Sequence, residues 1–214
     1  MINPYNQAYF DKLKSYEKTP IGIQLIKSRT KLIFWVMKHL KLNKKQLRLL
    51  DIGSGSGYLL DNLKIKNKYG YDVNPTSRKW LKEHNLWIDI NKKLPDIHVV
   101  CFFDVLEHIK SPKDLIKKFP LRTFFIISIP IFDDLKKVKN SKHYRPDEHL
   151  HYFTEHGIEL FMKYCGCELL LKNDDETLCG RENIMTFVFE KKREEKKAKF
   201  KIAKTHYRSL NLLN

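Results

Sequence analysis

The sequence predicts an α/β fold in which helices cover both faces of a mostly parallel sheet. Two observations lead to this prediction. Short apolar runs alternate along the chain with polar or amphipathic segments, and a glycine-rich turn follows the first of these runs. Such alternation is typical of parallel strands, because each parallel pair needs a long crossover connection, usually a helix. With 214 residues, the chain can bury the core of one domain.

Two helices are expected before the sheet, at Asn6–Glu17 and Ile21–Leu40. The second has an apolar stripe at helical spacing, formed by Ile26, Ile33, Val36, Met37 and Leu40. We therefore assign residues 1–45 to an N-terminal helical cap and expect this cap to cover the substrate.

Seven short apolar runs are predicted to be strands: Leu47–Ile52, Lys68–Asp72, Trp87–Ile90, His98–Phe103, Thr123–Ile129, Cys167–Lys172 and Ile184–Glu190. The last two are expected to form a C-terminal antiparallel hairpin, joined by the polar segment Asn173–Asn183. The strands and their connections define a domain at residues 46–191, with a lid insertion at residues 131–154. A basic helix or tail is expected at residues 192–214.

The chain carries a large positive charge. It has 41 Lys and Arg residues against 25 Asp and Glu residues, which gives a net charge of +16. Basic surfaces attract nucleic acids, and the segment from Glu190 to Asn214 holds nine Lys and Arg residues against three Glu residues. However, only 8 of the 41 cationic residues are arginine, the better phosphate ligand. A nucleic-acid partner stays open but is not favoured over compositional bias.

Neither end of the chain nor its apolar runs indicate a membrane segment. The N-terminal stretch MINPYNQAYFDKLK lacks the apolar core of a signal peptide. The longest strongly apolar run, near Phe124–Phe132, is too short to span a bilayer. The four cysteines show no paired C-x-x-C pattern, which favours reduced thiols. We expect a cytoplasmic protein with a small-molecule substrate, and the oligomeric state stays open.

The glycine-rich turn lies in LLDIGSGSGYLLDNL, at Leu49–Leu63. Gly53, Gly55 and Gly57 follow the first predicted strand, where a ligand can approach the backbone closely. Ligands in open α/β sheets bind beyond the carboxyl ends of the strands, so a nucleotide is the first expectation. The dinucleotide pattern G-x-G-x-x-G would need glycine at Tyr58 or Leu60, and no G-K-[ST] follows. The spacing therefore disfavours NAD, FAD and a P-loop.

Three carboxylates stand at the ends of successive predicted strands. Asp51 precedes the glycines and could attract an amine. Asp72, in YGYDVNP, could accept hydrogen bonds from both hydroxyls of a ribose. Asp89, in WIDI, could reach the amino group of adenine. A single aspartate at a strand end is more often a helix cap, but three in register indicate a nucleoside site.

At these residues the chain resembles the class I S-adenosylmethionine-dependent methyltransferases. The resemblance rests on LLDIGSGSGYLL, GYDVNP, WIDI, VVCFFDVLEHI, FFIISIPIF and PDEHLHYFT, and it is similar to the small-molecule branch with ubiquinone-biosynthesis and sugar O-methyltransferases. It implies a Rossmann-like fold and S-adenosylmethionine as cofactor. It also implies cofactor contacts from Asp51, Gly53, Ser54, Gly55 and Gly57 at the methionine part, Asp72 at the ribose, Val73, Asp89 and Ile90 at the adenine, and Asp104 and Val105 below the methionine carboxylate and amine.

A hydroxyl acceptor must lose its proton, and histidine suits this task because its ordinary pKa lies near neutral pH. The candidate catalytic residues are His108, His149 and His151. The plainer alternative is that these histidines only cap the helix after the fourth strand or form hydrogen bonds in the lid.

A metal site is a further alternative. Asp104, Glu107 and His108 are spaced to share one face of a helix, and with His149 or His151 they could hold a divalent ion. The spacing is similar to the E-x-x-E-H site of small-RNA 3′-end methyltransferases, although the first position here is the shorter aspartate. A metal-free site is the prediction.

The resemblance implies transfer of a methyl group to a hydroxyl of a small metabolite, lipid precursor or glycan. Amine methylation is disfavoured, because FFDVLEH replaces the usual N/D-P-P-Y/F turn. One alternative is an RNA-directed methyltransferase that uses the basic surface and tail. Another is a cofactor-binding module without activity.

Overall fold

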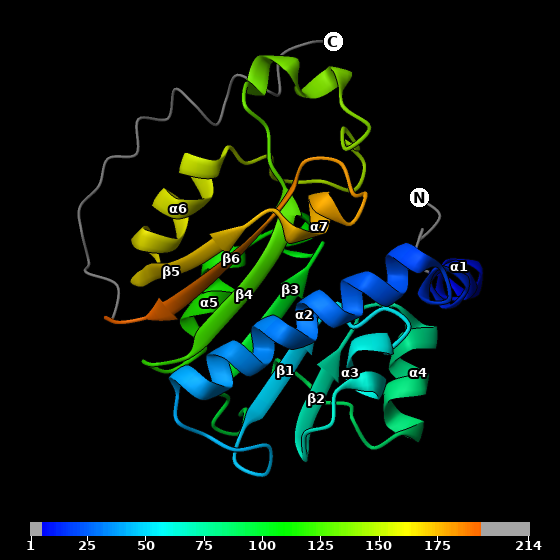
Figure 1. The fold of residues 1–214 in the computed structure, drawn as a ribbon, viewed down its shortest axis with the longest axis vertical. Coiled ribbons are helices and arrows are strands. Elements are labelled where there is room, and N and C mark those ends of the chain that lie inside the picture. The colour runs from blue at the N-terminus through cyan, green and yellow to red at the C-terminus, as the bar shows by residue number, and fades with distance from the viewer. Residues whose placement is uncertain (1–5, 194–214) are drawn as a thin grey trace.

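The structure is a computed structural model, which describes residues 6–193. Its centre is a six-stranded sheet in the order β2-β1-β3-β4-β6-β5 (Figure 1). Pairing is parallel from β2 to β4, whereas β6 runs antiparallel to both β4 and β5. The strands are β1 (Arg48–Ile52), β2 (Asn67–Tyr71), β3 (Val99–Phe103), β4 (Phe124–Pro130), β5 (Cys167–Asn173) and β6 (Ile184–Lys191).

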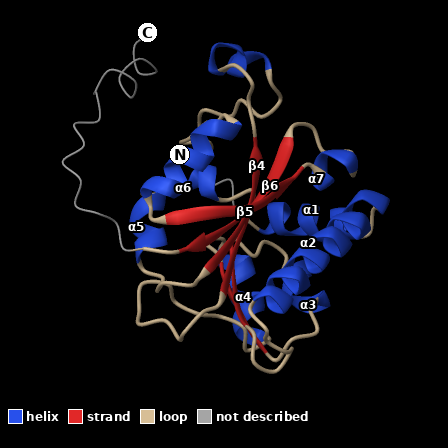
Figure 2. Cartoon of the chain, turned by 60° about the vertical axis from the view of Figure 1, so that its left-hand side comes forward, coloured by secondary structure: helices blue, strands red, loops and turns tan. Residues whose placement is uncertain are grey.

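Helices connect these strands and cover both faces of the sheet. Figure 2 shows α2 and α3 on one side of the strands and α5 and α6 on the other. The α-helices are α1 (Gln7–Glu17), α2 (Pro20–His39), α3 (Tyr58–Asn62), α4 (Pro75–Glu83), α5 (Pro112–Lys117), α6 (Glu155–Tyr164) and α7 (Asp175–Leu178), and two 3-10 helices are η1 (Leu106–His108) and η2 (Leu135–Asn140).

The core follows from the alternation of side chains along the strands. Leu49 in β1 points to the face covered by α2, where it joins Ile33 and Val36. Its neighbour Leu50 points to the other face, in the cluster that includes Ile116 of α5. Because both faces are covered, every residue of β3 and β4 is buried, which explains their continuous apolar runs.

The two N-terminal helices begin and end within one residue of their predicted bounds. The side chain of Asn6 accepts a hydrogen bond from the backbone N–H of Tyr9, and Thr19 does the same for Gly22. Pro20 stands at the first position of α2, where its missing N–H has no effect. The predicted N-terminal cap, residues 1–45, contains α1 and α2. Helix α2 packs directly on the sheet, where Ile33 and Val36 join the core cluster of β1.

The prediction of seven strands is wrong, because the segment Trp87–Ile90 pairs at only one position. Gly70 of β2 donates to the carbonyl of Leu86 (2.8 Å) and accepts from the N–H of Ile88 (3.1 Å). The side chain of Asp89 then accepts from the N–H of Asn91 (2.9 Å) and turns the chain away. The segment therefore contributes a single bridge at the sheet edge.

The C-terminal part of the sheet matches its prediction only loosely. The last two strands do pair antiparallel, but α7 interrupts their connection and β6 inserts between β4 and β5. The sheet is therefore mixed. Among residues 6–193, no helix is both long and apolar enough to cross a bilayer. Most of the predicted basic helix or tail, residues 194–214, lies outside the described residues.

Candidate active site

The glycine turn after β1 has the backbone conformation that its sequence predicts. Gly53 has φ +76° and Gly57 has φ +80°, in the left-handed region that favours glycine. A Cβ atom added at Gly53 would lie 2.2 Å from Cγ2 of Val105, and one at Gly57 would lie 2.0 Å from Cζ3 of Trp80. Both positions therefore need glycine. The turn brings Val105, predicted to contact the cofactor, directly against Gly53.

Asp72 follows β2, the strand next to β1, and forms a hydrogen bond with the glycine turn. One carboxylate oxygen accepts the N–H of Gly55 (2.7 Å) and the other accepts the N–H of Asn74 (2.8 Å). Burial raises the pKa of Asp72, and these backbone donors oppose that shift. A carboxylate offers about four lone-pair sites, so Asp72 can still accept a hydrogen bond from a ribose hydroxyl. The adjacent Val73 is 56% exposed, an open apolar contact.

Asp51, at the end of β1, is a buried carboxyl group without a hydrogen bond from any other described residue. Only 4% of its surface is exposed, and burial raises its pKa to about 7 despite the opposing charge of Arg29. The neighbouring Ser54 hydroxyl donates instead to the backbone carbonyl of Asp51 (2.8 Å). A carboxylate in this state is stabilised by a cationic partner, such as an amine.

Asp104 does not lie on a helix face with Glu107 and His108, contrary to the sequence prediction. Its φ of +58° turns the chain before η1, which spans only three residues. The Asp104 carboxylate instead pairs with Arg181 (2.8 Å) and lies 3.8 Å from a nitrogen of Arg29. Spacing alone misled the prediction, because it assumed a continuous helix from Asp104 onward.

Both arginines also bind Glu176 of α7, which is buried and completes a four-residue network. The Nε atom of Arg29 lies 2.7 Å from Glu176, and Arg181 contacts the other carboxylate oxygen. Burial favours the neutral acid, but the two arginines lower the pKa of Glu176 to about 2. No local motif in the sequence indicated this network, because Arg29 and Glu176 lie 147 positions apart.

Two of the three candidate histidines lie together. The rings of His108 and His149 meet edge to face, with centroids 4.6 Å apart. The Nδ1–H of His108 donates to the carbonyl of Glu148 (2.9 Å), because that oxygen can only accept. Burial and the neighbouring His108 and Arg145 lower the pKa of His149 to about 4. His151 is held apart, with its Nε2–H donating to the carbonyl of Ile109 (2.9 Å).

Glu107 lies beside this pair and is 3% exposed. Its Oε2 atom has no hydrogen-bond partner in the described part of the chain, and burial together with Asp104 raises the pKa of Glu107 to about 8. One ligand atom each from Glu107, His108 and His149 lie within 4.8 Å of one another, the one such group found among residues 6–193. The three could therefore hold a divalent ion, and the absence of a metal stays a prediction.

Helix α1 lies across the glycine turn. A Cβ atom on Gly55 would approach Cδ1 of Leu13 to 2.8 Å, and Lys14 lies over the ring of Trp80 at 5.2 Å. The hydroxyl of Tyr9 has a raised pKa, because of burial and the negative charges of Asp104 and Asp72. Tyr9 is thus near both carboxylates, a placement that no motif in the sequence indicated.

The other two residues predicted near the adenine occupy the edge beyond β2. Asp89 uses its carboxylate to accept the N–H of Asn91 (2.9 Å). Ile90 is almost fully buried and belongs to the core cluster under β1. Their contact with a cofactor stays a prediction.

This chain is similar to known methyltransferases in sequence and in fold. A family model described as a methyltransferase domain matches residues 26–172. The magnesium protoporphyrin IX methyltransferase of Synechocystis PCC 6803, solved with bound SAH, is 14% identical, with a TM-score of 0.62 over 87% of this chain and 96% of that one. An S-adenosylmethionine-dependent methyltransferase from Clostridium acetobutylicum ATCC 824 is 17% identical, with a TM-score of 0.62 over 87% of this chain and 100% of that one. No protein of curated function matches significantly.

The residues at the carboxyl ends of the strands fit the cofactor of such enzymes. The carboxyl group of Asp51 is buried, has no hydrogen bond from another described residue and suits an amino group, whereas Asp72 can still accept a hydrogen bond from a ribose. Val73 offers an exposed apolar contact beside Asp72. The structural likeness establishes the fold, and the family match extends over more than half of the chain. The chain therefore belongs to the methyltransferase-domain family, and it is an S-adenosylmethionine-dependent methyltransferase.

Proposed function

We propose that this enzyme methylates a hydroxyl oxygen of a small molecule, lipid precursor or glycan. The observation that carries this proposal is the pair of His108 and His149 beside Glu107, at the end of β3. A hydroxyl acceptor requires a proton acceptor, and an imidazole of this pair can supply one. The position after β3 is also close to the glycine turn, because Val105 contacts Gly53.

Within this proposal, the two carboxylates and the glycine turn bind the cofactor, which supplies a methyl group already activated on a sulfonium sulfur. Asp51 accepts hydrogen bonds from its amino group and Asp72 from its ribose. Gly53, Ser54, Gly55, Gly57 and Val105 line the methionine side, whereas Val73, Asp89 and Ile90 line the adenine side. Asp104 acts through Arg29 and Arg181, which shape the wall below the methionine part. Alignment of this kind can lower the barrier by several kcal/mol.

His108 is the better candidate for the base. Its Nδ1–H donates to Glu148, so its second nitrogen, Nε2, carries the lone pair that can accept a proton. Burial lowers the pKa of His108, and the hydrogen bond to the backbone carbonyl of Glu148 opposes this shift. The pKa of His149, lowered to about 4 mainly by burial, makes this residue a weak base. We therefore assign proton acceptance to His108 and positioning to His149, while His151 orders the lid through Ile109.

The experiment compares methyl transfer to hydroxyl and amine acceptors in a panel of metabolites, lipid precursors and glycans. His108→Ala is expected to lower kcat at least 100-fold while cofactor affinity stays within threefold, because proton removal occurs only during turnover. His156→Ala, at an exposed position of α6, is the matched control. Equal losses of turnover and cofactor affinity in His108→Ala would contradict the base assignment. Activity is expected to persist in EDTA, because no step requires a metal.

The RNA-directed alternative is supported by the net positive charge, and it is tested by adding RNA to this panel. Methylation of the RNA would favour this alternative. Cofactor binding without turnover of any acceptor would instead favour the inactive binding module.

A further inference from the structure

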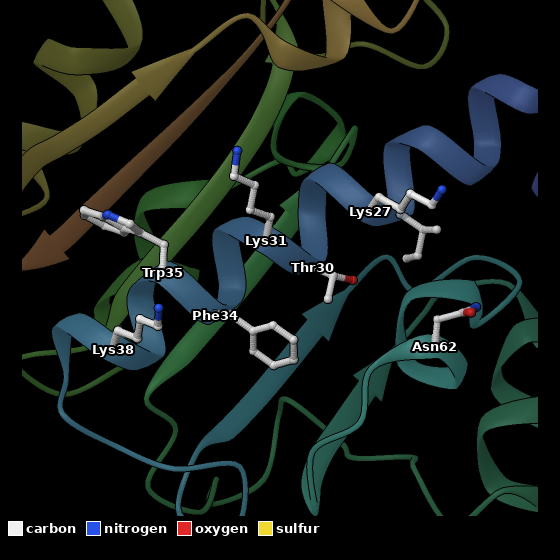
Figure 3. Close-up of a pocket in the computed structure, with 8 residues that line it drawn as sticks. Lys27, Thr30, Lys31, Phe34, Trp35, Lys38 and Asn62 are labelled. Carbon is white, nitrogen blue, oxygen red and sulfur yellow. The ribbon is translucent and has the colours of Figure 1, made fainter.

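A groove on the outer side of α2 lies away from the proposed active site. It has a volume of about 660 Å³ and is open to solvent along α2, with Asn62 of α3 on its far side. Figure 3 shows Thr30 and Phe34 on the side of α2 that faces Asn62, with lysines projecting along the helix. The groove begins near Lys27, within one turn of Arg29, and extends to Lys38, about 16 Å farther along the helix axis.

The exposed charges that α2 presents along the groove are all cationic. The sequence contains no Asp or Glu between Glu17 and Asp51. Three exposed lysines border the groove, at Lys27, Lys31 and Lys38, and three more follow α2 at positions 41, 44 and 45. Within residues 6–193, none of these six lysines forms an ion pair with a carboxylate. Unpaired like charges in one concave region concentrate the electric field and attract a polyanion.

Aromatic rings lie among these lysines. Trp35 is 37% exposed and stacks on His39, with ring centroids 5.5 Å apart and an interplanar angle of 27°. Phe34 is partly buried, and the ammonium group of Lys44 lies 5.1 Å from its ring centroid. A cationic groove with accessible aromatic faces is the combination that binds single-stranded nucleic acids, because phosphates contact the lysines while bases stack on the rings.

Charge excludes the two occupants that this chain itself could supply. A second copy would place the same lysine-rich face against this one. The C-terminal segment 194–214 carries six Lys and Arg residues against two Glu residues, so it would also be repelled. A flat anionic membrane fits less well, because Phe34 is partly buried and Trp35 lies along His39 at a concave surface.

We propose that the groove along α2 binds single-stranded nucleic acid, with phosphates at Lys27, Lys31 and Lys38 and a base on Trp35. This binding surface shares no lining residue with the proposed active site, and the proposal does not depend on which acceptor is methylated. Nucleic-acid affinity would then arise from the residues along α2 and not from the net charge of the whole chain.

The test measures the binding of the full-length protein to a fluorescent 20-nucleotide oligouridine by anisotropy, between 50 and 200 mM salt. The triple variant Lys27→Gln/Lys31→Gln/Lys38→Gln is expected to bind at least tenfold more weakly. Its plot of log affinity against log salt is expected to be less steep by about 2, at roughly 0.7 per lost phosphate contact. Trp35→Ala is expected to lose roughly fivefold or more in affinity with an unchanged salt slope, because stacking is not ionic.

The matched control is Lys92→Gln/Lys93→Gln/Lys163→Gln, which removes the same charge at exposed positions outside the groove. Calorimetry with the cofactor and thermal unfolding check that all variants remain folded. Equal losses of affinity in the two triple variants would overturn the proposal, because they would show an effect of net charge alone. Stronger binding to phosphatidylserine vesicles than to oligouridine, lost in Trp35→Ala, would also overturn it and favour a membrane.

Discussion

Several charged groups of the proposed active site are paired or hydrogen-bonded, whereas those along the α2 groove are exposed and unpaired among the described residues. At the carboxyl ends of the strands, Asp72 is held by backbone N–H groups, and Asp104 and Glu176 share two arginines. Along α2, Lys27 and Lys38 are exposed and have no carboxylate partner among the described residues. The net charge of +16 therefore describes the second region and says little about the first.

This difference determines how each region should respond to mutation. Removal of one partner from a buried ion pair leaves an uncompensated charge, which is strongly destabilising. Exposed charges are screened by salt, so their removal changes binding to a polyanion but barely affects stability. Five expected outcomes sharpen or break this contrast, including the His108 and groove experiments above.

The largest effect on stability is expected at Arg181. Arg181→Met leaves Asp104 and Glu176 with only Arg29, and unfolding in urea is expected to show a loss of about 3–5 kcal/mol. Lys79→Met is the control, because Lys79 pairs with Glu83 at the surface, and it should cost less than about 1 kcal/mol. An equally small loss of unfolding free energy in both variants would show that the Arg181 ion pairs contribute little to stability.

A large effect on cofactor affinity is expected at Asp72. Asp72→Ala removes the acceptor for the ribose and the anchor of the N–H groups of Gly55 and Asn74. Calorimetry is expected to show at least 100-fold weaker binding of S-adenosylmethionine, since hydrogen bonds to a charged group each contribute about 1.5–3 kcal/mol. Asp114→Ala, exposed on α5, is the control. Unchanged affinity in Asp72→Ala would refute the ribose assignment.

A smaller effect is expected in the pH dependence of stability at Glu107. Burial raises the pKa of Glu107 to about 8 from an ordinary 4.5, so between these values the folded protein holds a proton that the unfolded chain releases. This stabilising contribution is complete below pH 4.5 and is lost as the pH rises to 8, by at most about 1.4 kcal/mol per pH unit. Glu107→Gln should remove it.

Urea unfolding at pH 6.5 and pH 8 measures this slope. Asp51, whose pKa burial raises to about 7, contributes equally in both proteins and cancels in the difference. His149, whose pKa burial lowers to about 4, acts with the opposite sign and mainly below pH 6.5. Glu83→Gln is the exposed control. A wild-type slope retained in Glu107→Gln would show that Glu107 is already ionised in the folded protein.

The sequence by itself determined the features that depend on neighbouring residues. The sequence predicted the glycine turn with Gly53 and Gly57, the bounds of α1 and α2 to within one residue, and the position of Asp72 at the end of the second strand. Each arises from backbone conformation, capping or side-chain periodicity within a few residues. Even the pairing of β5 with β6 followed from two apolar runs adjacent along the chain.

The tertiary structure alone decided which distant side chains meet. Arg29 reaches Glu176 across 147 positions, and the positive φ of Asp104 turns it toward Arg181 instead of His108. The same holds for Trp87, whose apolar segment pairs with Gly70 at one position only. The physical reason is that burial and long-range pairing depend on how the layers pack, whereas local patterns report only what each segment can form.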